Sequence, residues 1–206
     1  MLVALGLAGG LAVRSVAGAA GAGEEADLGR RFYLEARSQL PLIEDPVVSE
    51  YVDHIAHRLV DTLGPQQFEY HFYVVQHPAL NAFAVPGGYV FVFSGLLARV
   101  ANDDELAGVL AHEIGHVSGH HIIRQQQQGQ VWNAAALLGA FLTVVNPVLG
   151  AGAIAAAETA QLQYSRVFEQ EADYLGLGYT TEAGFDPHSL ATFFKQLLLE
   201  QRVNPA

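Results

Sequence analysis

The pattern H-E-x-x-H, at residues 112–116, limits what this chain can fold into more than any other feature of its sequence. It lies in a segment with a helix-starting signal at residues 102–105 and with apolar residues at helical spacing, which are Leu106, Val109, Leu110, Ile114 and Val117. Residues four apart on a helix share one face, with Cβ atoms about 5–6 Å apart. His112 and His116 can therefore bind one metal ion together, and Glu113 beside them can take a proton from a water. The pattern predicts a zinc site on an amphipathic helix.

A third ligand must come from another part of the chain. One class of zinc enzymes uses H-E-x-x-H-x-x-G-x-x-H and a later methionine turn. Here the last position of that pattern holds Ile122 and the only methionine is Met1, so this class is excluded. A carboxylate from a second helix remains, and the candidates are Glu158, Glu169, Glu171 and Asp173.

Helical phase separates these acids. Glu169 and Asp173 are four apart and share a face, whereas Glu171 points away. Glu169 could then bind the metal while Asp173 accepts the free N–H of a ligand histidine. His120 and His121 follow the H-E-x-x-H pattern, but each helical turn advances about 5.4 Å, so a straight helix cannot aim all these histidines at one ion. We expect His120 and His121 to lie beside the ligands or at the surface.

The region before this helix alternates between helical and strand patterns. Asp45-Pro46 predicts a helix start and Gly64-Pro65 a stop, and between them lies an apolar stripe of Val48, Val52, Ile55, Leu59 and Leu63. Strands are expected at residues 68–75, 81–85 and 89–93, with a turn at 86–88. Helices and strands in this order predict an α+β fold.

Composition excludes several functions. The chain has 206 residues, with 10 Lys+Arg against 21 Asp+Glu and a net charge of −11. It therefore lacks the clustered cations that bind phosphate backbones, and we expect no nucleic-acid partner. Because it has no cysteine, it holds no cysteine nucleophile, iron–sulfur cluster or thiolate zinc site.

Two apolar stretches bear on localisation. Residues 2–13, followed by small residues and an acidic pair, are typical of an export signal, although no Lys or Arg precedes them. We therefore expect a leader at residues 1–23, a metallopeptidase domain at residues 24–206 and export to the periplasm. Residues 134–157 are interrupted at Asn146-Pro147, and neither half reaches the roughly 20 residues of a membrane span. This segment is predicted to be a mobile hairpin that covers the site as a lid or touches a membrane surface, with a buried helical pair as the alternative.

These residues together resemble the zinc metallopeptidase family that includes HtpX and the CAAX prenyl protease, and are most similar to its periplasmic BepA-like branch. The resemblance runs from about residue 24 to the C-terminus, and its matching segments are residues 81–92, 94–97, 112–116, 165–166, 169–173 and 184–187. It implies a mainly helical zincin-type domain with a small antiparallel or mixed sheet. The edge strand of that sheet would line the active-site cleft and pair with an extended, unfolded protein substrate through Asn81, Ala82, Phe83 and Ala84.

The resemblance also implies the roles of the site residues. His112, His116 and Glu169 would bind one Zn²⁺, Glu113 would be the general base, and Asp173 would hold a ligand histidine. The implied activity is hydrolysis of peptide bonds by a zinc-activated water, in cell-envelope protein quality control.

One role is left unassigned by the resemblance. The BepA-like branch continues into a Ser/Thr-His-Pro segment and often a helical-repeat domain, which this sequence does not contain. The donor that stabilises the transition state is therefore open among Tyr164, Arg166 and His188.

Two other functions stay open. The first is a chaperone-like or scaffold module with low proteolytic activity, which an intact Glu113 disfavours. The second is a membrane-associated processing protease, which would need several apolar spans of about 20 residues. The sequence leaves the oligomeric state undetermined.

Overall fold

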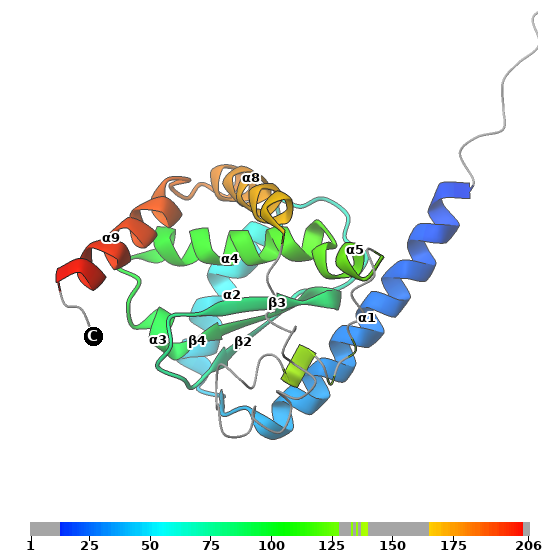
Figure 1. The fold of residues 1–206 in the computed structure, drawn as a ribbon, viewed down its shortest axis with the longest axis horizontal. Coiled ribbons are helices and arrows are strands. Elements are labelled where there is room, and N and C mark those ends of the chain that lie inside the picture. The colour runs from blue at the N-terminus through cyan, green and yellow to red at the C-terminus, as the bar shows by residue number, and fades with distance from the viewer. Residues whose placement is uncertain (1–12, 128–132, 134, 136, 140–164, 204–206) are drawn as a thin grey trace, which may run out of the picture.

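A computed structural model describes residues 13–127, 133, 135, 137–139 and 165–203, without the side chains of 13–22 and 197–203. The elements, in chain order, are α1 (Val13–Gln39), β1 (Leu42–Ile43), α2 (Pro46–Val60), β2 (His71–Val75), β3 (Ala82–Val85), the 3₁₀ turn η1 (Pro86–Gly88), β4 (Tyr89–Phe93), α3 (Ser94–Leu97), α4 (Asp103–Ser118), α5 (His121–Gln127), α8 (Arg166–Glu182) and α9 (Ser189–Val203). Helices predominate around one small sheet, which confirms the α+β prediction (Figure 1).

The sheet has the strand order β1-β2-β4-β3 and is mixed. β2 and β4 are parallel, while β1 and β3 pair antiparallel with their neighbours. β3 is therefore an edge strand. Its partner register, Phe83 opposite Phe91, and the bond from the Phe93 N–H to the Asn81 carbonyl fix which backbone groups face outward. Because bonded and non-bonded pairs alternate in an antiparallel ladder, the N–H and C=O groups of Ala82 and Ala84 point away from β4.

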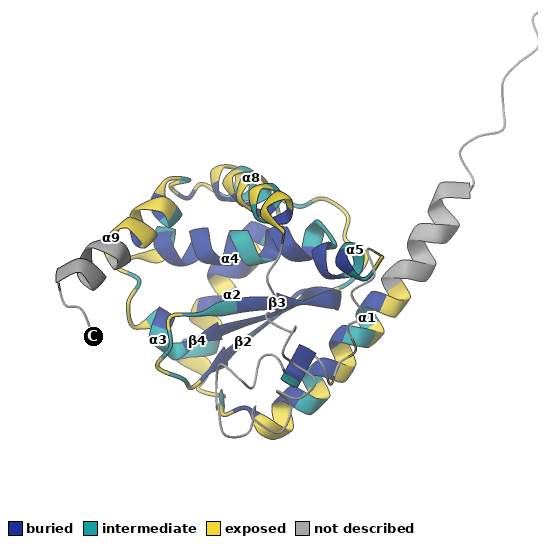
Figure 2. Ribbon diagram, in the orientation of Figure 1, coloured by how far each residue is buried: buried dark blue, intermediate teal, exposed yellow. Residues whose placement is uncertain are grey.

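Successive side chains of the strands enter two different cores, as the two-residue period of a strand requires. One face of the sheet packs against α2 and α4, and its buried side chains include Val74, Val90 and Val92. The other face packs against α1, where Phe32 meets Phe83 and Phe91 at ring-centroid distances of 6.1 and 5.5 Å. α8 and α9 cover the side of α4 that faces away from the sheet (Figure 1). α4 is thus the central helix, and Figure 2 shows most of it buried.

Several element boundaries differ from the sequence-based expectation. The strand expected at 68–75 begins only at His71, and the ring of Phe68 ahead of it lies near the rings of Tyr70 and His120. The long helix α1 was not expected. It continues across the boundary placed at residues 23 and 24, and residues 1–12 lie outside the described part, so the leader stays a prediction. No described helix is long and apolar enough to span a membrane.

The apolar segment 134–157 falls mostly outside the described residues. Its described residues 137–139 are helical, and Leu137 and Leu138 are buried in the core that α1 forms with the sheet. Apart from residue 135, which is helical and exposed, the rest of the segment is not described, so the choice between a lid, a membrane contact and a buried helical pair stays a prediction.

Candidate metal centre

The helix that carries H-E-x-x-H is fixed at its start and along one face. The side chain of Asn102 accepts a bond from the Glu105 N–H at 2.9 Å, while Glu105 accepts one from the Ala101 N–H at 2.8 Å. The first bond satisfies an N–H group that the first turn of α4 leaves unpaired, and the second ties Glu105 to the residue before the cap. The apolar residues that the sequence placed on one face of α4 are all buried, as Leu110 and Ile114, both 0% exposed, illustrate. α4 therefore has a fixed rotation, which directs its histidines toward α8.

Three side chains from two helices meet on that side. His112, His116 and Glu169 each offer a ligand atom, and these atoms all lie within 4.8 Å of one another. The Nε2 atoms of the two histidines are 3.1 Å apart, and the Glu169 carboxylate oxygens lie 3.6 Å from His112 Nε2 and 3.7 Å from His116 Nε2. Two imidazoles and one carboxylate converging on one point make a donor set that suits a divalent metal.

Asp173 stands behind the first histidine. Its Oδ1 lies 2.9 Å from His112 Nδ1, so the Nδ1–H can donate to it and the lone pair stays on Nε2, toward the cluster. Helical phase brings this about, because Glu169 and Asp173 are one turn apart on α8. The pKa of Glu169 is raised, first by burial and further by the negative charge of Asp173, against the lowering effect of His112.

The second histidine is held neutral by its surroundings. Burial, followed by the nearby His112 and His121, lowers the pKa of His116 to about 2. A neutral imidazole is the form that binds a metal, because its ring nitrogen must offer a lone pair.

Glu113 follows the first ligand histidine on α4 and contacts the edge strand β3. Its carboxylate accepts a hydrogen bond from the backbone N–H of Ala84, one of the outward-facing groups of β3. Burial raises the pKa of Glu113 to about 7, with Glu169 raising it further, while His112 and the Ala84 N–H lower it. A carboxyl group that titrates near neutral pH can both accept and return a proton there.

Two features that could bind a substrate lie near the metal cluster: the edge strand β3, and a pocket between α8 and α9. β3 contains Ala82, Phe83 and Ala84 of the predicted substrate strand, and Asn81 immediately precedes it. On the other side, a pocket of about 660 Å³ opens beside His112, between α8 and α9. Its lining is mainly apolar and includes Leu177, Leu190 and Phe194.

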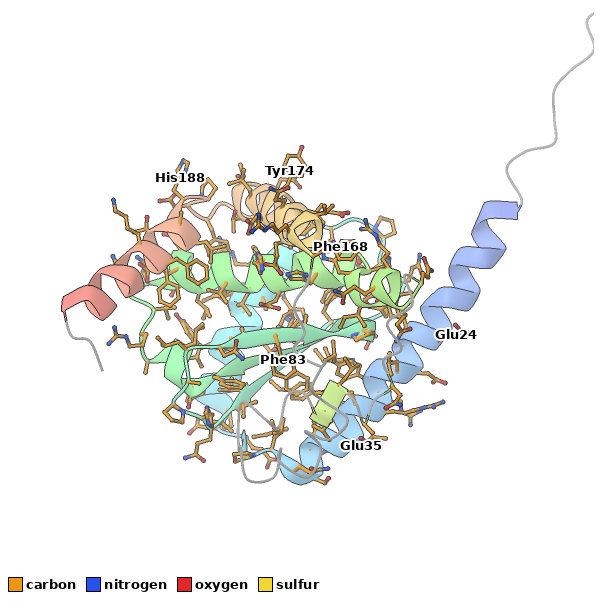
Figure 3. The ribbon with its side chains drawn as sticks, viewed as in Figure 1. Glu24, Glu35, Phe83, Phe168, Tyr174 and His188 are labelled. Carbon is orange, nitrogen blue, oxygen red and sulfur yellow. The ribbon has the colours of Figure 1, made fainter. Side chains whose placement is uncertain are left out.

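The expected transition-state donors are not assembled at the cluster. Arg166 is the first residue of α8 and is exposed, and His188 is exposed near the start of α9, where Figure 3 shows it pointing away from α4. No hydrogen bond or ion pair joins either of them to the cluster within the described ranges. Tyr164 lies outside those ranges.

His120 and His121 diverge because the chain turns between them and α4. His120 has a φ of 53°, in the left-handed region, just after α4 ends. Its Nδ1 lies 2.7 Å from the buried Glu25 carboxylate of α1. His121 turns back, and its Nδ1 lies 2.8 Å from His116 Nδ1. The sequence analysis left open whether these two residues lie beside the ligands or at the surface. It could not predict the turn, because no glycine marks the position that adopts the positive φ.

Comparison with known proteins identifies the group to which this arrangement belongs. The family model described as "Peptidase family M48" matches residues 46–201. The chain belongs to peptidase family M48. This confirms the resemblance found from the sequence, and the matched region contains all three residues of the cluster.

Named relatives of the chain include proteases from bacteria and from mitochondria. It is 37% identical over 174 residues to a putative beta-barrel assembly-enhancing protease of Vibrio cholerae, covering 81% of this chain and 36% of that protein. It is 32% identical over 188 residues to the beta-barrel assembly-enhancing protease of Escherichia coli, covering 87% of this chain and 39% of the relative. It is 33% identical over 152 residues to the mitochondrial metalloendopeptidase OMA1 of Schizosaccharomyces pombe, covering 71% of this chain and 43% of the relative. The chain thus spans less than half the length of these relatives.

Proposed function

We propose that this chain is a zinc-dependent metalloendopeptidase that hydrolyses extended segments of protein substrates. The observation that carries the proposal is the convergence of His112, His116 and Glu169, with Glu113 beside them. Zinc prefers this kind of donor set, and three protein ligands leave a fourth position for water, as in catalytic rather than structural zinc sites. When bound there, zinc lowers the pKa of a water toward about 7 and polarises the scissile carbonyl.

Glu113 supplies the proton transfers. As an ionised carboxylate it accepts a proton from the attacking water, and as an acid it returns the proton to the leaving amine. In the metal-free site burial raises the pKa of Glu113 to about 7, and a Zn²⁺ bound beside it would lower this pKa and favour the ionised form that acts as the base. The Ala84 N–H orients the carboxylate and favours its ionised form.

The edge of the sheet supplies substrate binding in this proposal. The outward N–H and C=O groups of Ala82 and the C=O of Ala84 can pair with a substrate backbone as an added strand, which requires a chain segment without structure of its own. The Ala84 N–H is not available for this pairing, because it donates to Glu113. The apolar pocket beside His112 can hold a nonpolar substrate side chain. Unfolded or extended proteins are therefore the substrate class that the site favours.

The relatives' names support a place for this activity in the cell envelope. Two of the bacterial relatives are named for enhancing beta-barrel assembly, and the mitochondrial ones are named metalloendopeptidases. Together with the export signal expected at residues 1–23, these names support a periplasmic enzyme of protein quality control.

Replacing the third ligand tests the proposal. Glu169→Gln should lose stoichiometric zinc and proteolysis of an unfolded protein such as casein, because a neutral amide is a poor zinc ligand. Glu182→Gln is the matched control, since Glu182 is exposed at the far end of the same helix, and it should keep both. Zinc is measured by elemental analysis and proteolysis by the appearance of new peptide ends. Full zinc content in the Glu169 variant would contradict the ligand assignment. A zinc-loaded wild type that binds casein without cutting it would favour the chaperone-like alternative.

A further inference from the structure

We propose that His121 is a positioning residue for the metal centre, and that it holds His116 in the tautomer and orientation that zinc binding needs. The proposal rests on the metal site proposed above and adds a residue that lies outside the H-E-x-x-H pattern. His121 is 0% exposed, and its Nδ1 lies 2.8 Å from His116 Nδ1.

The proton positions follow from the direction of each lone pair. His116 must offer Nε2 to the metal, so its proton lies on Nδ1, where it can be donated to His121 Nδ1. His121 then accepts at Nδ1 and carries its own proton on Nε2. That nitrogen lies 3.5 Å from a carboxylate oxygen of Glu171. His116 thus donates a hydrogen bond to His121, and the Glu171 carboxylate lies on the far side of the His121 ring.

Glu171 and its neighbours hold the His121 ring in place. Arg124 donates from Nη1 to both carboxylate oxygens of Glu171 at 2.8 Å, and also to the Gly119 carbonyl at 3.1 Å. Phe168 stacks on the His121 ring, with centroids 4.7 Å apart and planes 18° apart. Figure 3 shows Phe168 on the side of α8 that faces α4 and α5. The first turns of α8 therefore hold His121 as well as carrying the ligand Glu169.

The two ligand histidines then have different outer partners. His112 donates to a carboxylate, Asp173, whereas His116 donates to an imidazole. Outer partners of this kind fix the tautomer and the ring orientation of a ligand, and their loss costs about 10–100-fold in metal affinity. The turn at His120 is what brings His121 back to this position.

Zinc affinity of the apo protein, measured by competition with a chelator, tests the proposal. His121→Leu fills the space but cannot accept a hydrogen bond, and should weaken zinc binding about 10–100-fold. His121→Gln can accept from His116 Nδ1–H through its amide oxygen, and should recover most of the affinity. His120→Asn is the control, because asparagine tolerates positive φ and His120 contacts Glu25 instead, so its affinity should match the wild type.

Two results would overturn the proposal. One is a folded His121→Leu protein, checked by circular dichroism, that binds zinc as tightly as the wild type. The other comes from ¹⁵N correlation spectra of zinc-loaded wild type, which need no variant to fold. His121 should appear there as a neutral ring protonated on Nε2, and protonation on Nδ1 would contradict the proposed direction. Because Glu169→Gln tests the metal site independently, a failure of the His121 role can be told from a failure of the site.

Discussion

Replacing Gly176 by alanine would test whether the close approach of α8 and α4 sets the geometry of the metal centre. A Cβ at this position would lie 3.1 Å from the Ala111 carbonyl carbon and from the His112 nitrogen, and 3.2 Å from the Ala111 oxygen. Carbon atoms pack best at about 3.5–4.0 Å, so α8 would have to retreat by about 0.4 Å. These atoms belong to the backbone of α4, which cannot turn aside as a side chain can.

The expected magnitudes follow from this displacement. Glu169 lies on α8 and both ligand histidines lie on α4, while metal–ligand distances tolerate only about ±0.2 Å. We therefore expect zinc affinity to fall about tenfold, the lower end of the effect of a disturbed ligand environment. For stability, alanine gains about 1 kcal/mol of helix propensity but overpacking costs about 1–3 kcal/mol. The free energy of unfolding should therefore stay level or fall by up to about 2 kcal/mol.

Gly178 provides a matched control two residues further along α8. A Cβ there would meet nothing within 4 Å. Gly178→Ala should therefore raise the free energy of unfolding by up to about 1 kcal/mol and leave zinc affinity unchanged. Denaturant unfolding of the apo proteins and chelator competition measure both quantities. Identical stability and zinc affinity in the two variants would refute the reasoning.

Two further predictions concern the edge strand and α1. Ala84→Pro removes the N–H that donates a hydrogen bond to the Glu113 carboxylate. The pKa of Glu113 should therefore rise, and the acidic limb of the kcat/KM profile should move to higher pH. An acidic limb that stays in place would show that the Ala84 N–H has no part in the mechanism. The pKa of His120 is raised, chiefly by its hydrogen bond to Glu25. This contact therefore contributes its full stabilisation below the unfolded-state pKa of about 6.5, and the stabilisation is lost as the pH rises through the raised pKa. The difference in melting temperature between wild type and Glu25→Gln should therefore be largest at about pH 6 and shrink toward about pH 9, and a constant difference would contradict this account.

The parts of the fold that could be predicted from the sequence are those set by local interactions. α4 was predicted because its cap, its apolar period and its histidine spacing all lie within one segment. β4 was predicted with its observed bounds because a turn precedes it and its residues favour strands. The pairing of Glu169 with Asp173 followed from helical phase alone, and the structure places both near His112.

The remaining features depend on contacts between distant segments. The small residues at the start of α1 gave no helical stripe, and its later residues are fixed by packing on the sheet through Phe32. The place of His121 depends on the left-handed backbone conformation of His120, which is uncommon for any residue other than glycine. Glu171 was expected to point away from the metal site, and it is not part of the cluster of ligand atoms. It contacts Arg124 and His121 instead. Such contacts appear only once α5 and α8 are placed in space.

The most direct test of the proposed mechanism is the proteolytic rate of zinc-loaded Glu113→Gln. Because both histidines and Glu169 are intact in this variant, zinc should stay bound at one per chain, as elemental analysis can check. Loss of the general base should lower the rate of casein cleavage by about 10²–10⁴-fold relative to wild type. A zinc-loaded Glu113→Gln protein that cleaves casein at the wild-type rate would contradict the central claim that this carboxylate carries the proton.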